Sequence, residues 1–233
     1  MSSSNYILND IIDVEKDKIH PQKKARPLAA GEITVRKAGF IAALLAICSL
    51  SIGIALSPAF FYILLTFFFL TQLYSLYFKQ ELFLDLMCIA TNFVLRAIGG
   101  AYILGVRLSP WLIVCTFFLS LFIAVGKRKA DAMLLQNKAS EHKKVLSEYT
   151  PQLTNTLLII STTALLMSYS LYSFLSIYPH LIYTLPLAMY VILRYFFLIE
   201  TASIIALQPE YFYQDRKLVL GILLWCMSVI ILI

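Results

Sequence analysis

The sequence predicts an all-α protein, a polytopic transmembrane helical bundle, and two observations carry this prediction. Of its 233 residues, 60% are hydrophobic and 14% are charged, whereas a soluble domain has roughly 45–50% apolar and about 25% charged residues. The apolar residues also fall in long runs, without the alternation that marks the strands of a membrane β-barrel. These features exclude a soluble globular enzyme, a disordered chain and a collagen-like fibre.

The apolar runs predict about seven spans within a single transmembrane domain over residues 1–233. A spanning helix needs roughly 17–25 residues, so the fourth run is short and the seventh reaches the last residue. A polar head (9–37), a long loop (126–152) and a medium loop (201–216) separate the runs, and the other connections are tight turns. The predicted spans are residues 38–56, 59–77, 82–104, 110–125, 153–175, 180–200 and 217–233.

The charges predict the orientation of the chain. If the spans alternate in direction from a cytoplasmic polar head, every basic residue falls on the cytoplasmic side except Arg96, Arg107 and Arg194. This distribution is a strong positive-inside signal. The acidic residues gather on or near the same side, which the rule does not require. Charges of both signs on one face indicate a polar reaction chamber that opens to the cytoplasm.

A stripe of oxygen ligands lies in the polar head. Asn9, Asp13 and Asp17 are spaced by four and share one face of a helix, with Asp10 at its border. Carboxylate and amide oxygens suit Mg²⁺, which keeps several waters and is shared with substrate phosphates. The alternative is a solvated helix end with charge pairs, but like charges at this spacing repel.

Cations follow the stripe directly and make it a candidate diphosphate site. Acids that hold a metal, followed by cations that bind phosphate oxygens, suit such a ligand. These cations are Lys23, Lys24 and Arg26.

A second polar cluster follows the fourth span, where Lys127, Arg128 and Lys129 precede Asp131. Lys127 and Asp131 are four apart, so on a helix both can face the first cluster. We expect Lys127 and Arg128 of this cluster to bind substrate phosphate. The alternative is a basic anchor at the end of a span.

Polar residues within or beside the spans are further candidates. An ionisable group at membrane depth usually faces a cavity or a partner, so Arg96 is expected to contact substrate phosphate or an acid such as Asp85; the alternative is a structural pair with a neighbouring helix. Arg194 either lines the chamber or extends to the surface. Lys79 can reach a phosphate and Tyr74 lies near it, although interfacial tyrosines are common in membrane helices.

The run N-D-x-x-D-x-x-x-D from Asn9 to Asp17, with R-P-L-A-x-G from Arg26 to Gly31, resembles the first signature of the UbiA-type intramembrane prenyltransferase superfamily. Further features resemble its decaprenyl-phosphate phosphoribosyltransferase branch, and the resemblance covers essentially the whole chain. These features are Tyr74 with Lys79 and residues 95–100, 126–131, 147–150, 193–195, 209–210 and 215–216.

The resemblance implies a nine-span, Mg²⁺-dependent transferase. Asn9, Asp10, Asp13 and Asp17 would hold the metal, and Asp13, Asp17 and Asp131 would be catalytic. The branch transfers a 5-phosphoribosyl group from phosphoribosyl diphosphate to a polyprenyl (decaprenyl-type) phosphate, for cell-envelope lipid-linked sugar synthesis. The resemblance also implies that the protein lies in a bacterial plasma membrane and has no nucleic-acid partner. It leaves open whether the protein forms a homo-oligomer.

The second cluster bears on the choice of donor. Prenyl-diphosphate users of the superfamily typically carry a second acid-rich motif, D-x-x-x-D, where this chain has one acid, Asp131, and three cations. Extra cations favour a donor with an additional phosphate, as phosphoribosyl diphosphate has. The alternatives are a prenyltransferase that moves a prenyl group to an aromatic or other small acceptor, and a transporter or non-catalytic membrane subunit.

In the family the first signature follows the second span, whereas here it begins at residue 9 after a short apolar stub, residues 4–8. We therefore expect that two helices of the family fold are missing from this chain, through a misassigned start or because it is a fragment.

Overall fold

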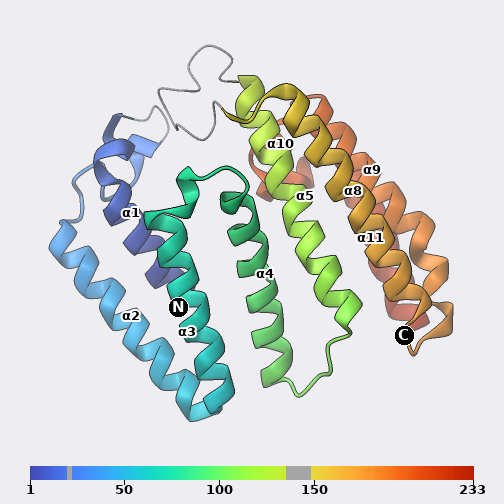
Figure 1. Ribbon diagram of the computed structural model, residues 1–233, viewed down its shortest axis with the longest axis horizontal. Helices are drawn as coiled ribbons and strands as arrows, with labels where there is room; N and C mark the ends of the chain where they lie inside the picture. The colour runs from blue at the N-terminus through green and yellow to red at the C-terminus, as the bar shows by residue number, and fades with distance from the viewer. Residues whose placement is uncertain (20–22, 135–147) are drawn as a thin grey trace. The chain divides into compact units, whose positions relative to one another are not determined.

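The computed structural model describes residues 1–19, 23–134 and 148–233, and over these ranges it contains helices and connecting turns without strands (Figure 1). This confirms the all-α prediction. The long helices are α1 (Ser2–Ile19), α2 (Val35–Leu56), α3 (Pro58–Leu76), α4 (Leu84–Ile103), α5 (Pro110–Leu134), α8 (Pro151–Phe174), α9 (Leu185–Glu200) and α11 (Arg216–Leu232). The short ones are η1 (Lys23–Ala25), η2 (Phe78–Gln80), η3 (Pro179–Thr184), α10 (Ile204–Leu207) and η4 (Pro209–Gln214).

Local sequence sets where the helices begin. The side chains of Thr34, Thr150 and Asp215 accept hydrogen bonds from backbone N–H groups in the first turns of α2, α8 and α11, which satisfies donors that a helix start leaves open. Proline occupies the first turn of several helices, where its missing N–H costs nothing. These prolines include Pro58 and Pro151.

The helices match the predicted spans closely. Among the described residues, six helical segments are long and apolar enough to cross a membrane: residues 35–56, 58–76, 84–103, 110–133, 151–174 and 179–200. The seventh predicted span corresponds to α11, whose 17 residues stand at the short end of the range for spanning helices. The chain is an integral membrane protein.

Two predicted loops contain helix instead. The fourth span was expected to end at residue 125, but α5 continues through the basic run to Leu134. Its hydropathy falls at Lys127, yet no proline or glycine interrupts the chain from there to Leu134, so the helix persists. The medium loop likewise contains α10 and η4. In the polar head, α1 carries the acidic stripe as a helix as far as Ile19, as the spacing required.

The chain divides into two compact units, the first of residues 1–88 and 95–107. In it, α1 packs against α2 and α3. The buried Ser4 hydroxyl donates to the backbone carbonyl of Ala42 at 2.8 Å, and Gln72 donates to the side-chain oxygen of Asn5, also at 2.8 Å. These polar contacts between helices fix the rotation of α1, and therefore which of its faces points toward α3.

The second unit comprises residues 89–94 and 108–233. Its most extensive helix contact is between α5 and α8, which lie side by side (Figure 1). Thr154, Ser161 and Ser168 are seven residues apart on α8, with Leu158 and Leu165 between them, and all five are buried. A seven-residue repeat of small polar side chains with leucines between them allows two membrane helices to approach closely.

Candidate functional site

The acidic stripe on α1 lies in the first unit and is engaged by cations. Asp17 is 4% exposed and accepts a hydrogen bond from Arg26 at 2.8 Å, while Lys23 lies 3.9 Å from its other oxygen. The same guanidinium nitrogen of Arg26 donates to Asp10 at 2.7 Å. Because one nitrogen contacts both carboxylates, Asp10 and Asp17 converge on a single point, which α1 alone does not bring about.

The loop after η1 delivers Arg26 to this point. The N–H of Arg26 donates to the carbonyl of Lys23, and the N–H of Ala30 donates to the carbonyl of Arg26, at 2.9 and 2.8 Å. Gly31 closes the turn with φ of +79°, a conformation that glycine adopts without strain. Lys24, also predicted to bind phosphate, is exposed beside this turn.

Lys79 reaches the stripe from a different helix. Its ammonium group, at η2 just after α3, donates to the Asp13 carboxylate at 2.7 Å, and its side chain is buried. The sequence singled out both residues but not their contact. The first unit thus brings together six of the predicted residues: Asp10, Asp13, Asp17, Lys23, Arg26 and Lys79.

Burial and the neighbouring charges both act on the Asp10 carboxyl of the stripe. Burial raises the pKa of the Asp10 carboxyl above its ordinary value; Arg26 opposes this shift, the negative charges of Asp17 and Asp13 add to it, and Lys23 opposes it. A cation bound beside these carboxylates would relieve the repulsion between Asp10, Asp13 and Asp17.

The donor set fits Mg²⁺ shared with a substrate. In the described part of the chain, no three acidic, histidine or cysteine side chains form a metal-binding group by themselves. Mg²⁺ is usually held by one or two carboxylates plus waters and substrate phosphates, and Asp10 and Asp17 already meet at one cation. Asn9 lies half-buried on the same helix.

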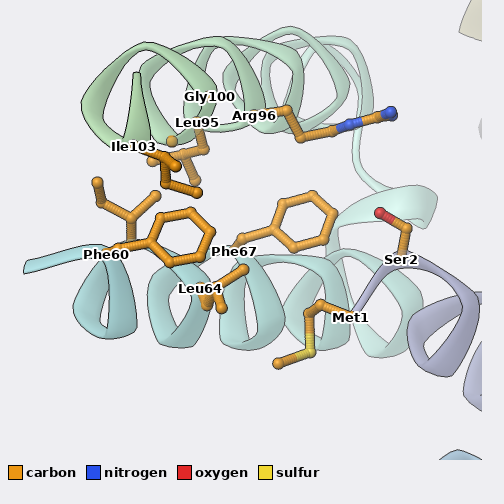
Figure 2. Close-up of a pocket in the computed structure, with 11 residues that line it drawn as sticks. Met1, Ser2, Phe60, Leu64, Phe67, Leu95, Arg96, Gly100 and Ile103 are labelled. Carbon is orange, nitrogen blue, oxygen red and sulfur yellow. The ribbon is translucent and has the colours of Figure 1, made fainter. Parts of the chain in front are cut away.

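Arg96 lies on α4 and lines an apolar pocket of about 310 Å³ in the first unit. Phe60, Leu64 and Phe67 of α3 form one wall, and α4 forms the other (Figure 2). The Arg96 guanidinium points toward the end of the pocket where Ser2 lies, away from Ile103 (Figure 2). A cation at one end of an apolar cavity suits an amphiphile with an anionic head.

Tyr74 on α3 and Asp85 on α4 were also singled out in the sequence. Tyr74 lies half-buried on α3. Asp85, the predicted partner of Arg96, is completely buried in the first turn of α4. The roles proposed for Tyr74 and for Arg96 stay predictions.

The second cluster lies on the last turns of α5, in the second unit. Lys127 is exposed, whereas Arg128 and Lys129 are only 6% and 4% exposed. A basic anchor at a membrane surface works through exposed charge. The burial of Arg128 and Lys129 therefore does not fit that alternative. Arg128 lies 3.7 Å from Asp131, and Lys129 pairs with Glu200 of α9.

Arg194 of α9 pairs with Asp215, the residue directly before α11. Its guanidinium donates two hydrogen bonds to Asp215, at 2.6 and 3.2 Å, and Asp215 also caps α11 through the Leu218 N–H at 2.7 Å. The Arg194 guanidinium holds the pKa of Asp215 below its usual value. This contact gives Arg194 a structural function between α9 and α11, and substrate binding by Arg194 stays a prediction.

Comparison with known proteins decides the family. The family model for UbiA prenyltransferases matches residues 1–213. The chain belongs to the UbiA prenyltransferase family. The sequence resemblance is therefore confirmed at family level.

The UbiA relatives with curated names include two decaprenyl-phosphate phosphoribosyltransferases. The protein from Mycolicibacterium smegmatis is 34% identical over 173 residues, which cover 74% of this chain and 54% of that protein. The protein from Corynebacterium glutamicum is 34% identical over 177 residues, covering 74% and 53%. The chain thus spans about half the length of these curated relatives.

Solved structures of the UbiA family share the fold. A UbiA homolog from Archaeoglobus fulgidus bound to GPP and Mg²⁺ superposes with a TM-score of 0.75 at 20% identity, covering 97% of this chain and 82% of that chain. The same homolog bound to DMAPP and Mg²⁺ gives a TM-score of 0.73 at 21% identity, covering 85% and 71%. At these identities the likeness shows the fold alone.

Proposed function

We propose that the protein transfers a 5-phosphoribosyl group from phosphoribosyl diphosphate to a polyprenyl phosphate and releases diphosphate. The observation that carries this proposal is the contact of the α1 carboxylates with cations from other segments, in which Arg26 joins Asp10 to Asp17 and Lys79 engages Asp13. Carboxylates interleaved with cations suit a magnesium diphosphate, because the acids bind the metal and the cations bind phosphate oxygens. The names of the curated relatives support the same reaction.

Mg²⁺ would be held by one or two of the carboxylates of Asp10, Asp13 and Asp17, with Asn9 beside them, together with substrate phosphate oxygens. When bound, it would neutralise negative charge that develops on the leaving diphosphate. Arg26 and Lys79 would then exchange their carboxylate contacts for contacts to the diphosphate oxygens. Such preorganised charge supplies most of the rate in phosphoryl-type leaving-group chemistry.

The chemical step balances without a proton transfer. The bond between the anomeric carbon and the diphosphate oxygen breaks, and the diphosphate leaves with the electron pair. An oxygen of the lipid phosphate forms the new bond to that carbon. Because the lipid phosphate is ionised at neutral pH, no general base is required, and the chain's residues act by positioning and electrostatics.

The second cluster supports phosphoribosyl diphosphate as the donor. Arg128 is a buried cation that lies beside Asp131. With the exposed Lys127, it provides charge for the 5-phosphate that a prenyl diphosphate lacks. Asp131 is proposed to orient Arg128 within this group.

The apolar pocket beside Arg96 (Figure 2) supports a lipid acceptor. We propose that the first isoprene units of the polyprenyl chain lie along Phe60, Leu64 and Phe67, with the phosphate toward Arg96. The rest of the tail would extend between the helices into the bilayer. A membrane-embedded chain suits this reaction, because the apolar tail of the acceptor lies in the lipid phase.

We further propose that the site faces the cytoplasm of a bacterial cell, since the basic residues gather on one side of the spans. Residues 1–233 would contribute one transmembrane domain, built from the two compact units.

Prenyl transfer to a small acceptor is the second candidate. It is favoured by the ligands named for the structural neighbours, GPP with Mg²⁺ and DMAPP with Mg²⁺. The two reactions differ in the donor, so donor use discriminates between them.

The test supplies membranes containing the protein with phosphoribosyl diphosphate labelled in the ribose, or with a labelled prenyl diphosphate. We expect the ribose label to enter an organic-soluble lipid in the presence of Mg²⁺ and polyprenyl phosphate. Entry of the prenyl label alone would select the second candidate. Asp13→Asn should abolish transfer, whereas Glu15→Gln on the same helix is the matched control, because Glu15 is exposed and pairs with the neighbouring Lys18.

A further inference from the structure

The helices α5 and α9 meet along a regular seam in the second unit. On α5 the seam uses positions i, i+4 and i+7, which fall on one face of a helix. At its start, the rings of Phe122 and Tyr195 pack edge to face with centroids 5.6 Å apart. The three contacts, in order, are Phe122 with Tyr195, Gly126 with Ile199, and Lys129 with Glu200.

Gly126 sets the separation of the two helices. A Cβ atom at this position would lie 2.4 Å from the Cδ1 atom of Ile199, closer than van der Waals contact allows. Ile199 is completely buried. The absence of a side chain at Gly126 therefore lets α9 approach α5 closely, immediately before the basic run begins.

The ion pair at the end of the seam is unequal in burial. The Lys129 ammonium group is almost completely buried, whereas the Glu200 side chain is 41% exposed. Removing one partner of a buried pair leaves the other charge uncompensated, and the damage is large only when the remaining charge is the buried one. Loss of Glu200 should therefore be harmful, and loss of Lys129 should be mild.

The seam also determines where the other residues of the second cluster point. At about 100° per residue, the face of Lys127 and Asp131 lies roughly 150° around α5 from the face of Gly126 and Lys129. Holding Gly126 and Lys129 against α9 therefore directs Lys127 and Asp131 away from α9. A rotation of this end of α5 would move both residues together.

We propose that Glu200 is a positioning residue, which acts through Lys129 to fix the rotation of the end of α5 and so present Lys127, Arg128 and Asp131 to the donor. This inference rests on the proposed function, because that function makes the cluster a phosphate site. In this proposal Lys129 is a structural cation, and the neighbouring residues of the cluster make the phosphate contacts.

Three variants separate this function from its alternatives: Glu200→Gln, Lys129→Met, and the double variant. Glu200→Gln should raise the KM for phosphoribosyl diphosphate about tenfold, a factor that corresponds to ~1.4 kcal/mol, and leave the KM for the lipid phosphate unchanged. Lys129→Met should change the donor KM by less than about threefold, since the remaining carboxylate is solvated. The double variant should recover most of the loss, because it removes the uncompensated cation.

Other patterns overturn the proposal. If Lys129 binds the donor directly, Lys129→Met is the most damaged variant and the double variant is equally damaged. If Glu200 takes part in the chemistry, Glu200→Gln lowers kcat and the double variant does not recover. If the pair is incidental, no variant changes the donor KM. Size-exclusion chromatography in detergent would identify a variant that does not fold. If Glu200→Gln has such a defect, recovery of the donor KM in the double variant decides between these patterns.

A binding measurement keeps this inference separate from the proposed function. Ribose 5-phosphate, which carries the phosphate assigned to this cluster, is titrated calorimetrically into the purified full chain and the same three variants. If the wild-type chain transfers no ribose label but binds ribose 5-phosphate with the predicted order of variants, the proposed function fails and the positioning inference stands. If transfer occurs but all variants bind ribose 5-phosphate and phosphoribosyl diphosphate equally, the inference fails and the function stands. If the wild-type chain binds neither anion, the inference is overturned.

Discussion

The sharpest consequence of the site concerns Asp17, which we would change to asparagine. The Asp17 carboxylate is almost completely buried, accepts a hydrogen bond from Arg26 at 2.8 Å and lies 3.9 Å from Lys23. Asparagine keeps the size and one acceptor oxygen but removes the charge. The substitution therefore tests the charge of the stripe with little change in packing.

The expected effect of Asp17→Asn follows from the loss of the hydrogen bond between Arg26 and a charged carboxylate. A hydrogen bond to a charged group contributes about 1.5–3 kcal/mol, which corresponds to a factor of roughly 10–150 in an equilibrium or rate constant. If Asp17 also binds Mg²⁺ in the reacting complex, the loss falls on the transition state, so kcat/KM for the donor should decrease by at least the lower factor. The Mg²⁺ concentration for half-maximal rate should rise in parallel.

The assay measures initial rates of ribose transfer over a series of Mg²⁺ concentrations, with Glu15→Gln as the control. The Glu15 side chain is 78% exposed and pairs with the exposed Lys18, a kind of contact that contributes about 0–1 kcal/mol. We expect the control to retain wild-type Mg²⁺ dependence. An Asp17→Asn protein with unchanged rate and unchanged Mg²⁺ dependence would refute the assignment of Asp17 to the metal.

Three further predictions test other parts of the account. Lys79→Met should lower kcat/KM for the donor by about tenfold or more in initial-rate assays, because a charged hydrogen-bond partner is lost. A side chain at Gly100 would enter open space in the apolar pocket. Gly100→Leu should therefore raise the KM for the lipid phosphate by roughly tenfold, in the range that one mis-sized apolar group costs. The control Gly39→Leu, which places a side chain in open space on α2, should leave that KM unchanged. Arg194 depresses the pKa of Asp215. Their contact therefore stabilises the fold fully at pH values above the ordinary carboxyl pKa of about 3.9, and this stabilisation is lost as the pH falls through the depressed pKa. Asp215→Asn, which preserves the helix cap, should lower the unfolding temperature at neutral pH and match the wild type in strong acid.

Each of these has a result that would contradict it. Equal lipid KM values for Gly100→Leu and Gly39→Leu would remove the pocket from the acceptor site. An unfolding-temperature difference for Asp215→Asn that persists unchanged into strong acid would show that the ion pair is not its cause. A normal donor kcat/KM for Lys79→Met would confine that lysine to a structural pairing with Asp13.

The sequence was sufficient to predict the features that depend on local periodicity. The spacing of Asn9, Asp13 and Asp17 predicts a shared face as soon as the segment is helical, and α1 is helical there. Arg26 lies only nine residues beyond Asp17, so a short loop can return it to the stripe, and their contact is of this kind. Apolar runs likewise predict the spans, because the bilayer requires long apolar helices.

Contacts between segments far apart in the sequence could not be predicted from the residue pattern of a single helix. Lys79 meets Asp13 across 66 residues, and Lys129 meets Glu200 across 71. Each contact depends on how two helices pack and rotate, which no periodicity within one helix determines. The signal available for Glu200 was an acid at the end of a predicted span, on the same side of the membrane as an excess of cations.

Hydropathy also misplaced the end of the fourth span. It treats each lysine and arginine as a boundary, whereas Arg128 and Lys129 are buried within α5. A buried cation is tolerated when a carboxylate compensates it, and Asp131 and Glu200 stand close to them. The boundary is therefore a property of the folded unit.

The most direct test of the central claim, that the α1 carboxylates hold a divalent cation together with diphosphate, is an electron paramagnetic resonance titration with Mn²⁺ in place of Mg²⁺. Inorganic pyrophosphate should strengthen Mn²⁺ binding to the purified chain, and Asp13→Asn and Asp17→Asn should abolish that strengthening while Glu15→Gln retains it. Equal Mn²⁺ and pyrophosphate binding by all four proteins would contradict the claim.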